Sequence, residues 1–221
     1  MSRKIGQWQD SSRVYHERAE EYDSWFANSL LFDIETAAVL ALNIPTESPA
    51  LEIGVGPGRF AEALHSGFGI DPAFAPLKIS RTRNITVCQA IGEALPFHSK
   101  AFARVSLFFT ICFVQNPEKV FQEVKRVLQD KGHLVLGFVP ASSKWGQNLQ
   151  QKKEDGHPFY EHANFFKLEN VTTLLAEQGF SLTGSVSSLY QTPGEVNQME
   201  SPQFVLDENA GFIVIAAQKA P

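Results

Sequence analysis

A short apolar run leads directly into a glycine-rich turn at residues 51–60, which read LEIGVGPGRF. Gly54, Gly56 and Gly58 lack the Cβ atoms that would keep a ligand away from the main chain. A helix expected at about residues 59–65 would offer free N–H groups to negative charge just beyond the turn. The segment therefore predicts a strand, a turn and a helix arranged to bind a polar ligand.

The spacing of the glycines discriminates between classes of nucleotide site. A nicotinamide or flavin fold prefers G-x-G-x-x-G, but the sixth position here is Arg59, and the third glycine, Gly58, comes one residue early. A nucleotide-dependent oxidoreductase is therefore a secondary alternative. Another alternative is a turn that only joins a strand to a helix. Asp71 argues against it, because its carboxylate follows the next predicted strand and could accept both hydroxyls of a ribose.

Apolar runs bounded by turn residues predict the strands that position these groups. Such runs suit strands buried on both faces. They lie at residues 50–53, 68–70, 86–89, 105–109, 133–139, 180–190 and 211–217. The first five alternate with helical patterns, which implies a parallel sheet with right-handed crossovers and helices on both faces. No convincing helix separates the last two runs, so we expect an antiparallel strand at the C-terminal end.

Amphipathic patterns predict the helices that cover this sheet. In the clearest, residues 117–128, Asn116 can cap the first turn and Pro117 stands within it. A second pattern places Leu31, Ile34, Ala38 and Leu42 on one stripe. A third runs over Leu168, Val171, Leu174 and Leu175 and stops at Gly179. Lys78, Arg81 and Arg83 are most simply the solvated side of a helix after Asp71, with a phosphate-binding patch as the alternative.

Composition and charge narrow the class of protein. The chain has 221 residues, and its 43% hydrophobic and 19% charged residues exclude a wholly disordered protein. A formal charge of -5 argues against the basic surface that nucleic-acid binding requires and favours a small-molecule partner. We expect a single domain over residues 1–221. Residues 1–28 and 140–164 do not fit the repeating unit and are expected to cover the site.

Cysteine content and hydropathy indicate the compartment. Cys88 and Cys112 are too few for a disulfide scaffold and lack the paired spacing of a zinc site, so we expect a reducing compartment and no metal. The N-terminus lacks the apolar core of a secretory signal, and the longest apolar-rich stretch, residues 105–114, is too short to span a bilayer. These features predict a cytoplasmic protein without membrane attachment.

From about Tyr15 to Val139 the chain resembles the class I S-adenosylmethionine-dependent methyltransferases, in particular the small type-11 group that acts largely on metabolites. The resemblance implies a Rossmann-like, doubly wound α/β fold with a mostly parallel seven-stranded sheet and an antiparallel C-terminal strand. It also implies S-adenosyl-L-methionine as cofactor and a small-molecule methyl acceptor. The family's ligand positions match the segments around the glycine turn, Asp71, the residues AIGEALPF at 90–97 and the expected fourth strand.

Several residue roles follow from this resemblance. Glu52 and the three glycines would hold the methionine part of the cofactor, Asp71 would hold the ribose, and Thr110 would lie beside them. The loop with Ile91, Gly92 and Glu93 would hold adenine. Residues 1–28 would form lid helices, with Tyr22 closing over the transferable methyl group, and residues 140–164 would form an insertion that caps the substrate.

The sequence departs from the family pattern at two positions. Ile91 and Ala103 stand where the family usually has acids, so the adenine amino group would need another partner, such as Glu93. These losses leave open a non-catalytic cofactor-binding or partner-binding protein that kept the fold. If a base assists the reaction, the candidates are His16, Tyr22, Cys112, His157 and His162. The spacing of the last two histidines favours an aromatic-rich substrate cap over a metal site.

Overall fold

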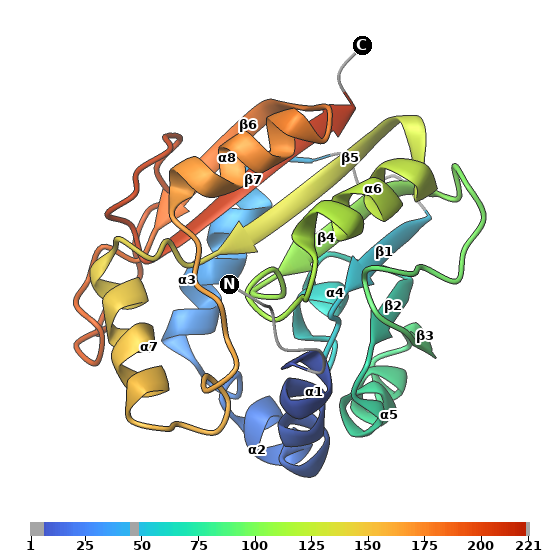
Figure 1. Ribbon diagram of the computed structural model, residues 1–221. Helices are drawn as coiled ribbons and strands as arrows, with labels where there is room; N and C mark the ends of the chain where they lie inside the picture. Colours follow the sequence, from blue (N-terminus) through green and yellow to red (C-terminus); the bar gives the residue numbers. More distant parts are fainter. Residues whose placement is uncertain (1–6, 45–48, 220–221) are drawn as a thin grey trace.

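The computed structural model describes residues 7–44 and 49–219, and Figure 1 shows their arrangement as a sheet with helices on both faces. The strand order across the sheet is β3-β2-β1-β4-β5-β7-β6. The strands are β1 (Ala50–Ile53), β2 (Phe68–Asp71), β3 (Thr86–Gln89), β4 (Phe102–Phe108), β5 (Leu128–Phe138), β6 (Phe180–Ser188) and β7 (Phe212–Lys219). The first five strands in this order, from β3 through β2, β1 and β4 to β5, pair in parallel. Strand β7 pairs antiparallel with both of its neighbours, β5 and β6. This arrangement confirms the expected fold class.

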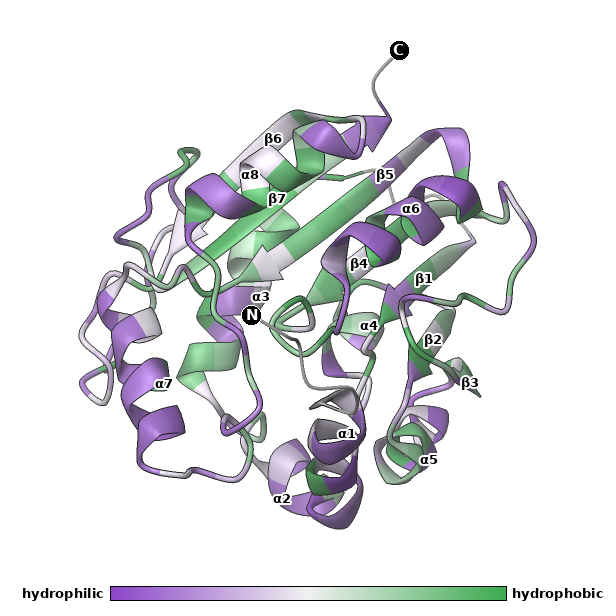
Figure 2. Cartoon of the chain, in the orientation of Figure 1, coloured by the Kyte–Doolittle hydropathy of each residue, from purple (hydrophilic) through white to green (hydrophobic). Residues whose placement is uncertain are grey.

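Two helical layers enclose the sheet. Helices α6 (Pro117–Val127) and α8 (Leu168–Glu177) bury Val120, Phe121 and Leu175 on one face in the main core. Helix α3 (Leu30–Ala41) packs with α4 (Arg59–Ala63) on the other face, and α5 (Phe74–Thr82) contacts α4 beside them. Figure 2 shows the hydrophobic sheet between helices whose outer sides are hydrophilic. The burial of apolar side chains on both faces explains the continuous apolar runs of the inner strands.

Three further helices lie near the carboxyl ends of the parallel strands, at the bottom of Figure 1. They are α1 (Gln7–Glu17), α2 (Ala19–Ser24) and α7 (Lys144–Glu154). In an open α/β sheet this edge is where ligands bind. Residues 1–6 of the expected N-terminal lid lie outside the described residues. Among the described helices, none is long and apolar enough to cross a lipid bilayer.

The predicted element boundaries hold best where caps and turns define them. The Asn116 side chain accepts a hydrogen bond from the Lys119 N–H at 3.0 Å, as expected of the cap. The largest shift is at the start of β5, which begins at Leu128 rather than at residue 133, and β4 begins at Phe102 rather than at residue 105. Arg104 is buried within β4, and its guanidinium donates to the Leu64 carbonyl at 2.6 Å, which gives the buried charge a hydrogen-bond partner.

Candidate functional site

A cavity of about 110 Å³ opens at the carboxyl ends of β1, β2 and β4. Its wall brings together most of the residues that the sequence assigned to the cofactor. They are Glu52, Gly54, Gly56, Asp71, Ile91, Gly92, Glu93 and Thr110, with Tyr22 above them. Because parallel strands end at one edge of the sheet, segments far apart in the sequence meet here.

The three glycines of the turn serve different purposes. A Cβ on Gly54 would lie 2.2 Å from the hydroxyl of Thr110, and a Cβ on Gly58 would lie 2.6 Å from Ile85. Gly58 is not on the cavity wall, so its expected contact with a cofactor is replaced by a packing role. At Gly56 the nearest atom to such a Cβ belongs to Tyr22, at 3.6 Å. All three have positive φ, so glycine is also favoured by the backbone.

Two of the three carboxyl groups on the cavity wall belong to Asp71 and Glu52. Asp71 accepts hydrogen bonds from the N–H groups of Gly56 at 3.0 Å and Ala73 at 2.8 Å. Burial raises the pKa of Asp71 to about 6, although both N–H groups act to lower it. Burial also raises the pKa of Glu52, against the opposing charge of Arg104, and Glu52 Oε2 has no hydrogen-bond partner among the described residues. The cavity therefore presents buried acceptors that suit a cationic or hydroxyl-bearing ligand.

The loop after β3 forms another side of the cavity and is fixed from behind by α6. Glu93 accepts from the N–H groups of Gln115 at 2.8 Å and Asn116 at 3.1 Å. Glu123 accepts from the Leu95 N–H at 2.9 Å, and Arg126 donates to the Leu95 carbonyl at 3.1 Å. One oxygen of Glu93 thus accepts hydrogen bonds from two backbone N–H groups. The apolar side of Ile91 and the backbone of Gly92 face the cavity.

An ionic cluster fixes the N-terminal helices over the glycine turn. Asp23 accepts from Arg59 at 2.7 Å and from Arg83 at 3.0 Å. Burial acts to raise the pKa of Asp23, but the hydrogen bonds from both arginines hold it below its ordinary value. Arg83 is therefore not on a solvated face and is not part of a phosphate-binding patch, which were the two interpretations that the sequence had left open. Tyr22, which precedes Asp23 in the chain, is held with its ring against Gly56.

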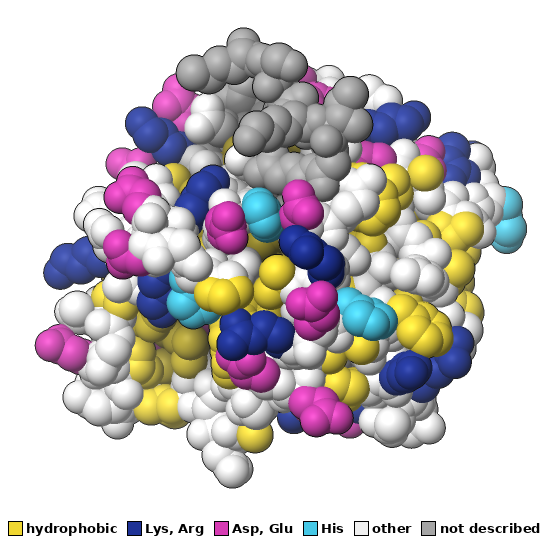
Figure 3. Space-filling view, turned by 60° about the horizontal axis from the view of Figure 1, so that its bottom comes forward, with side chains coloured by type: hydrophobic (Ala, Val, Ile, Leu, Met, Phe, Trp, Pro, Cys, Tyr) yellow, Lys and Arg dark blue, Asp and Glu magenta, His cyan; other side chains and the backbone are white. Residues whose placement is uncertain are grey.

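A second cavity of about 360 Å³ adjoins the first. The two cavities share wall residues Tyr15, Tyr22, Phe26, Phe109 and Phe113. More than half of the residues that line the second cavity are Phe, Tyr or Trp. Its volume falls within the usual range for a small-molecule site, about 300–1,000 Å³. This side of the molecule is brought forward in Figure 3, where charged side chains of both signs surround exposed hydrophobic ones.

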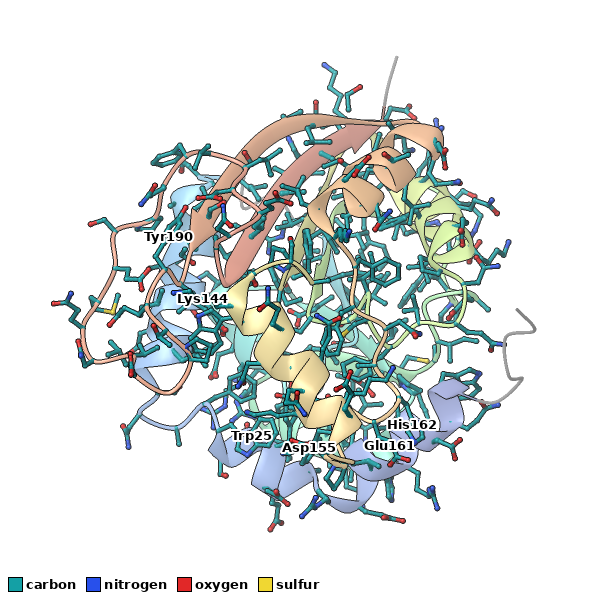
Figure 4. The ribbon with its side chains drawn as sticks, turned by 60° about the vertical axis from the view of Figure 1, so that its left-hand side comes forward. Trp25, Lys144, Asp155, Glu161, His162 and Tyr190 are labelled. Carbon is teal, nitrogen blue, oxygen red and sulfur yellow. The ribbon has the colours of Figure 1, made fainter. Side chains whose placement is uncertain are left out.

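Phe159 joins the N-terminal helices to the segment that follows α7. Its ring centroid lies 4.7 Å from that of Trp25, 5.2 Å from Tyr15 and 5.8 Å from Tyr22. Figure 4 shows α7 from Lys144 to Asp155, with Trp25 near its lower end. Aromatic pairs at these distances add to the stabilisation from buried area. The two segments that the sequence assigned to cover thus pack on each other.

The candidate bases separate into different environments. His16 is on neither cavity wall, because its Nδ1 accepts from the Ala75 N–H at 3.2 Å, and the structure removes it from the candidates. Cys112 lines the second cavity, but burial raises the pKa of its thiol to about 12, so it is not a base near neutral pH. His162 is on neither wall. Tyr22 and His157 remain beside the second cavity, and burial holds the pKa of Tyr22 above and that of His157 below the ordinary value.

Glu35 is a wall residue that the sequence analysis missed. It is 7% exposed and follows Leu31 by one turn of α3, so both side chains reach the second cavity. Burial raises the pKa of Glu35 to about 8. A signal was present, because Glu35 stands beside Ile34 on the predicted apolar stripe, where an acid would be costly in an ordinary core.

Comparison with known proteins identifies the class. Residues 51–136 match the family described as "Methyltransferase domain". An uncharacterized protein of Mycobacterium tuberculosis is 37% identical over 203 residues, which are 90% of this chain and 71% of that protein. Another, from Methanocaldococcus jannaschii, is 34% identical over 207 residues, covering 93% of this chain and 98% of the relative.

Solved structures agree with this match. A Thermotoga maritima structure described as a SAM-dependent methyltransferase, "possible histamine N-methyltransferase", aligns with a TM-score of 0.88 and 32% identity, covering 95% of this chain and 99% of that one. A geranyl diphosphate C-methyltransferase from Streptomyces coelicolor shares the fold, with a TM-score of 0.71, 15% identity and full coverage of both chains. The chain belongs to the class I S-adenosylmethionine-dependent methyltransferases, whose cofactor is S-adenosyl-L-methionine. This membership sets aside the oxidoreductase alternative.

Proposed function

We propose that the protein transfers a methyl group from S-adenosylmethionine to a small-molecule acceptor, with the cofactor at the glycine turn and the acceptor in the aromatic cavity. The observation that carries the proposal is the adjacency of the two cavities, which share Tyr22 and four other aromatic wall residues. A methyl donor and its acceptor must meet in line, so two chambers with a common wall suit this reaction.

The polar groups at the glycine turn fit the cofactor. Glu52 has an unpartnered, buried carboxyl oxygen that can accept from the α-ammonium group of the methionine part. Asp71 retains lone pairs for the two ribose hydroxyls after its hydrogen bonds to the turn. Ile91 provides an apolar surface for the adenine face, while Gly92 brings bare backbone to its edge. Gly56 lets the ligand approach the main chain.

When bound, the cofactor supplies an activated methyl group on a sulfonium, together with its leaving group. The protein then contributes orientation and the exclusion of water. Tyr22 and Phe109 lie on both walls and border the passage between the chambers. Residues 1–28 act as a lid and residues 140–164 as a cap, held together through Phe159. In this proposal the N-terminal helices, which line the cavity at the glycine turn, move outward as the cofactor enters.

No side chain needs to act as a nucleophile in this reaction. Tyr22 has a raised pKa and keeps its proton near neutral pH, so we assign it a positioning role rather than that of a base. Cys112 keeps its proton as well, with its thiol donating to the Phe109 carbonyl at 3.0 Å. His157 is the member of the sequence-predicted set that remains available to take a proton beside the acceptor cavity.

Isothermal titration with S-adenosylhomocysteine tests the cofactor half of the proposal. We expect saturable binding to the folded chain, and absence of binding at millimolar ligand would refute the proposal. A panel of amine, thiol, hydroxyl and carboxylate acceptors, followed by mass spectrometry, tests the transfer. The description of the Thermotoga relative places amines first in that panel. Binding without any methylated product would favour the non-catalytic alternative.

A further inference from the structure

The second cavity holds one acidic side chain among its apolar walls. Of the described residues that line it, Glu35 is the single carboxylic acid, Lys152 the single lysine or arginine and His157 the single histidine, and most of the rest are aromatic or aliphatic. Lys152 is exposed, its Nζ lies 5.9 Å from the centroid of the Tyr160 ring, and no positive charge acts on the pKa of Glu35. The interior of the cavity therefore carries an acid that the protein does not neutralise with a cation.

The Glu35 carboxyl has no ion pair or hydrogen bond with the described part of the chain. Burial is the cause of its raised pKa, and no neighbouring charge offsets it. A buried polar group without a partner destabilises a protein, and a buried charge does so more strongly. A ligand that brings a positive charge into the cavity would remove this cost, because an opposite charge within a few ångströms favours the carboxylate.

The surrounding rings suit the same kind of ligand. Phe32, Trp145 and Tyr160 line the cavity together with Glu35, and they come from α3, α7 and the segment after α7. Aromatic faces attract organic cations through their quadrupoles, most strongly where water is excluded. Neither an anionic nor a neutral acceptor would use both the carboxyl and the rings.

We propose that the acceptor is a small organic cation of the ammonium type, whose charge is neutralised by Glu35 inside this aromatic cavity. An ammonium nitrogen has no free electron pair, so the methylated atom is either this nitrogen after it gives its proton to a base beside the cavity, such as His157, or another group of the same molecule. The inference rests on the proposed function, since it names the class of molecule that would occupy the acceptor chamber. It assigns Glu35 to recognition of charge and makes the distinction between amine, alcohol and acid a property of one side chain.

Three probes of nearly equal shape test the proposal by titration into the full chain saturated with S-adenosylhomocysteine. They are 2-phenylethylamine, 2-phenylethanol and 3-phenylpropanoate. We expect the amine to bind at least about tenfold more tightly than the alcohol, corresponding to about 1.4 kcal/mol, and the carboxylate to bind most weakly. Equal affinity of amine and alcohol, or tighter binding of the carboxylate, would overturn the proposal on the unaltered protein.

Two variants test whether Glu35 is the residue that causes the preference for the amine over the alcohol. Glu35→Gln keeps the shape of the side chain and should bring the ratio of amine to alcohol affinity close to one. Asp33→Asn removes an exposed acid from the same helix and should leave the ratio unchanged. If Glu35→Gln still binds the amine more tightly than the alcohol by the same ratio, the assignment of Glu35 to recognition of charge is contradicted. Should Glu35→Gln fail to fold, the three-probe series on the unaltered protein still decides. Failure to bind S-adenosylhomocysteine would refute the proposed function, whereas loss of the amine preference alone would refute only this inference.

Discussion

The two adjoining cavities are built from different parts of the chain. The cavity at the glycine turn is formed largely by strand ends and backbone, and its groups are held by short hydrogen bonds such as that between Asp71 and Gly56. The aromatic cavity is formed by side chains from α3, the N-terminal helices and residues 138–166. The polar groups of the first are set by backbone that the sheet and its turns define, whereas the second can change its specificity through side-chain substitution without altering the sheet.

Loss of the ring that joins the covering segments should have the largest effect. Phe159 is 2% exposed, so Phe159→Ala should lower the free energy of unfolding by about 3 kcal/mol. Chemical denaturation measures this loss, and Phe204→Ala, at a residue that is 75% exposed, is the control. If the aromatic cavity is the more adaptable region, binding of S-adenosylhomocysteine should change much less than stability. An equal loss in both quantities would contradict the distinction.

A change at the strand ends should affect binding of S-adenosylhomocysteine more than stability, which is the reverse of the effect expected for Phe159→Ala. Asp71→Ala removes the carboxylate that we assign to the ribose and should weaken binding of S-adenosylhomocysteine by roughly 1.5–3 kcal/mol, as measured by calorimetry. It also removes the acceptor of the Gly56 N–H, so the turn itself becomes less ordered. The control is Asp130→Ala, which alters an exposed acid paired with Lys100. Unchanged affinity in Asp71→Ala would move the ribose elsewhere.

The smallest expected effect concerns the pH dependence of stability. The pKa of Glu35 is raised to about 8 in the folded chain, so the folded state keeps a proton that the unfolded state loses above its ordinary pKa. Stability should therefore fall as the pH rises from about 4.5 to about 8. Glu35→Gln does not titrate, so its stability relative to the unaltered chain should rise over that range.

Thermal unfolding at several pH values measures this difference, with Asp33→Asn as control. A difference that stays constant with pH would show that Glu35 is not shielded from water in the cavity. The other titratable residues that line the same cavity must be considered in the comparison. They are Tyr15, Tyr22, Cys112, Lys152, His157 and Tyr160. All remain in both proteins, so their contributions cancel in the difference.

The contrast between the cavities also explains what the sequence could predict. The glycine turn and Asp71 were predictable because a strand, a turn and a helix that are adjacent in sequence fix the backbone around them. The role of Gly58 was not, since Ile85, which crowds it, belongs to a distant segment. Glu35 lay on a recognised helical pattern, but periodicity does not tell whether a buried position faces packed core or an open cavity. That distinction depends on wall residues from separate segments, which include residues 109–113 and 138–166.

Tyr22 stands in the wall between the chambers, and its neighbour Asp23 is held by Arg59 at the start of the helix that follows the glycine turn. If the N-terminal helices act as the proposed lid, an outward swing that admits the nucleoside would dismantle one side of the acceptor chamber at the same time. The chamber would be whole again only after the helices had returned. We therefore expect a compulsory order of association, in which the methyl donor enters first and its spent form departs last.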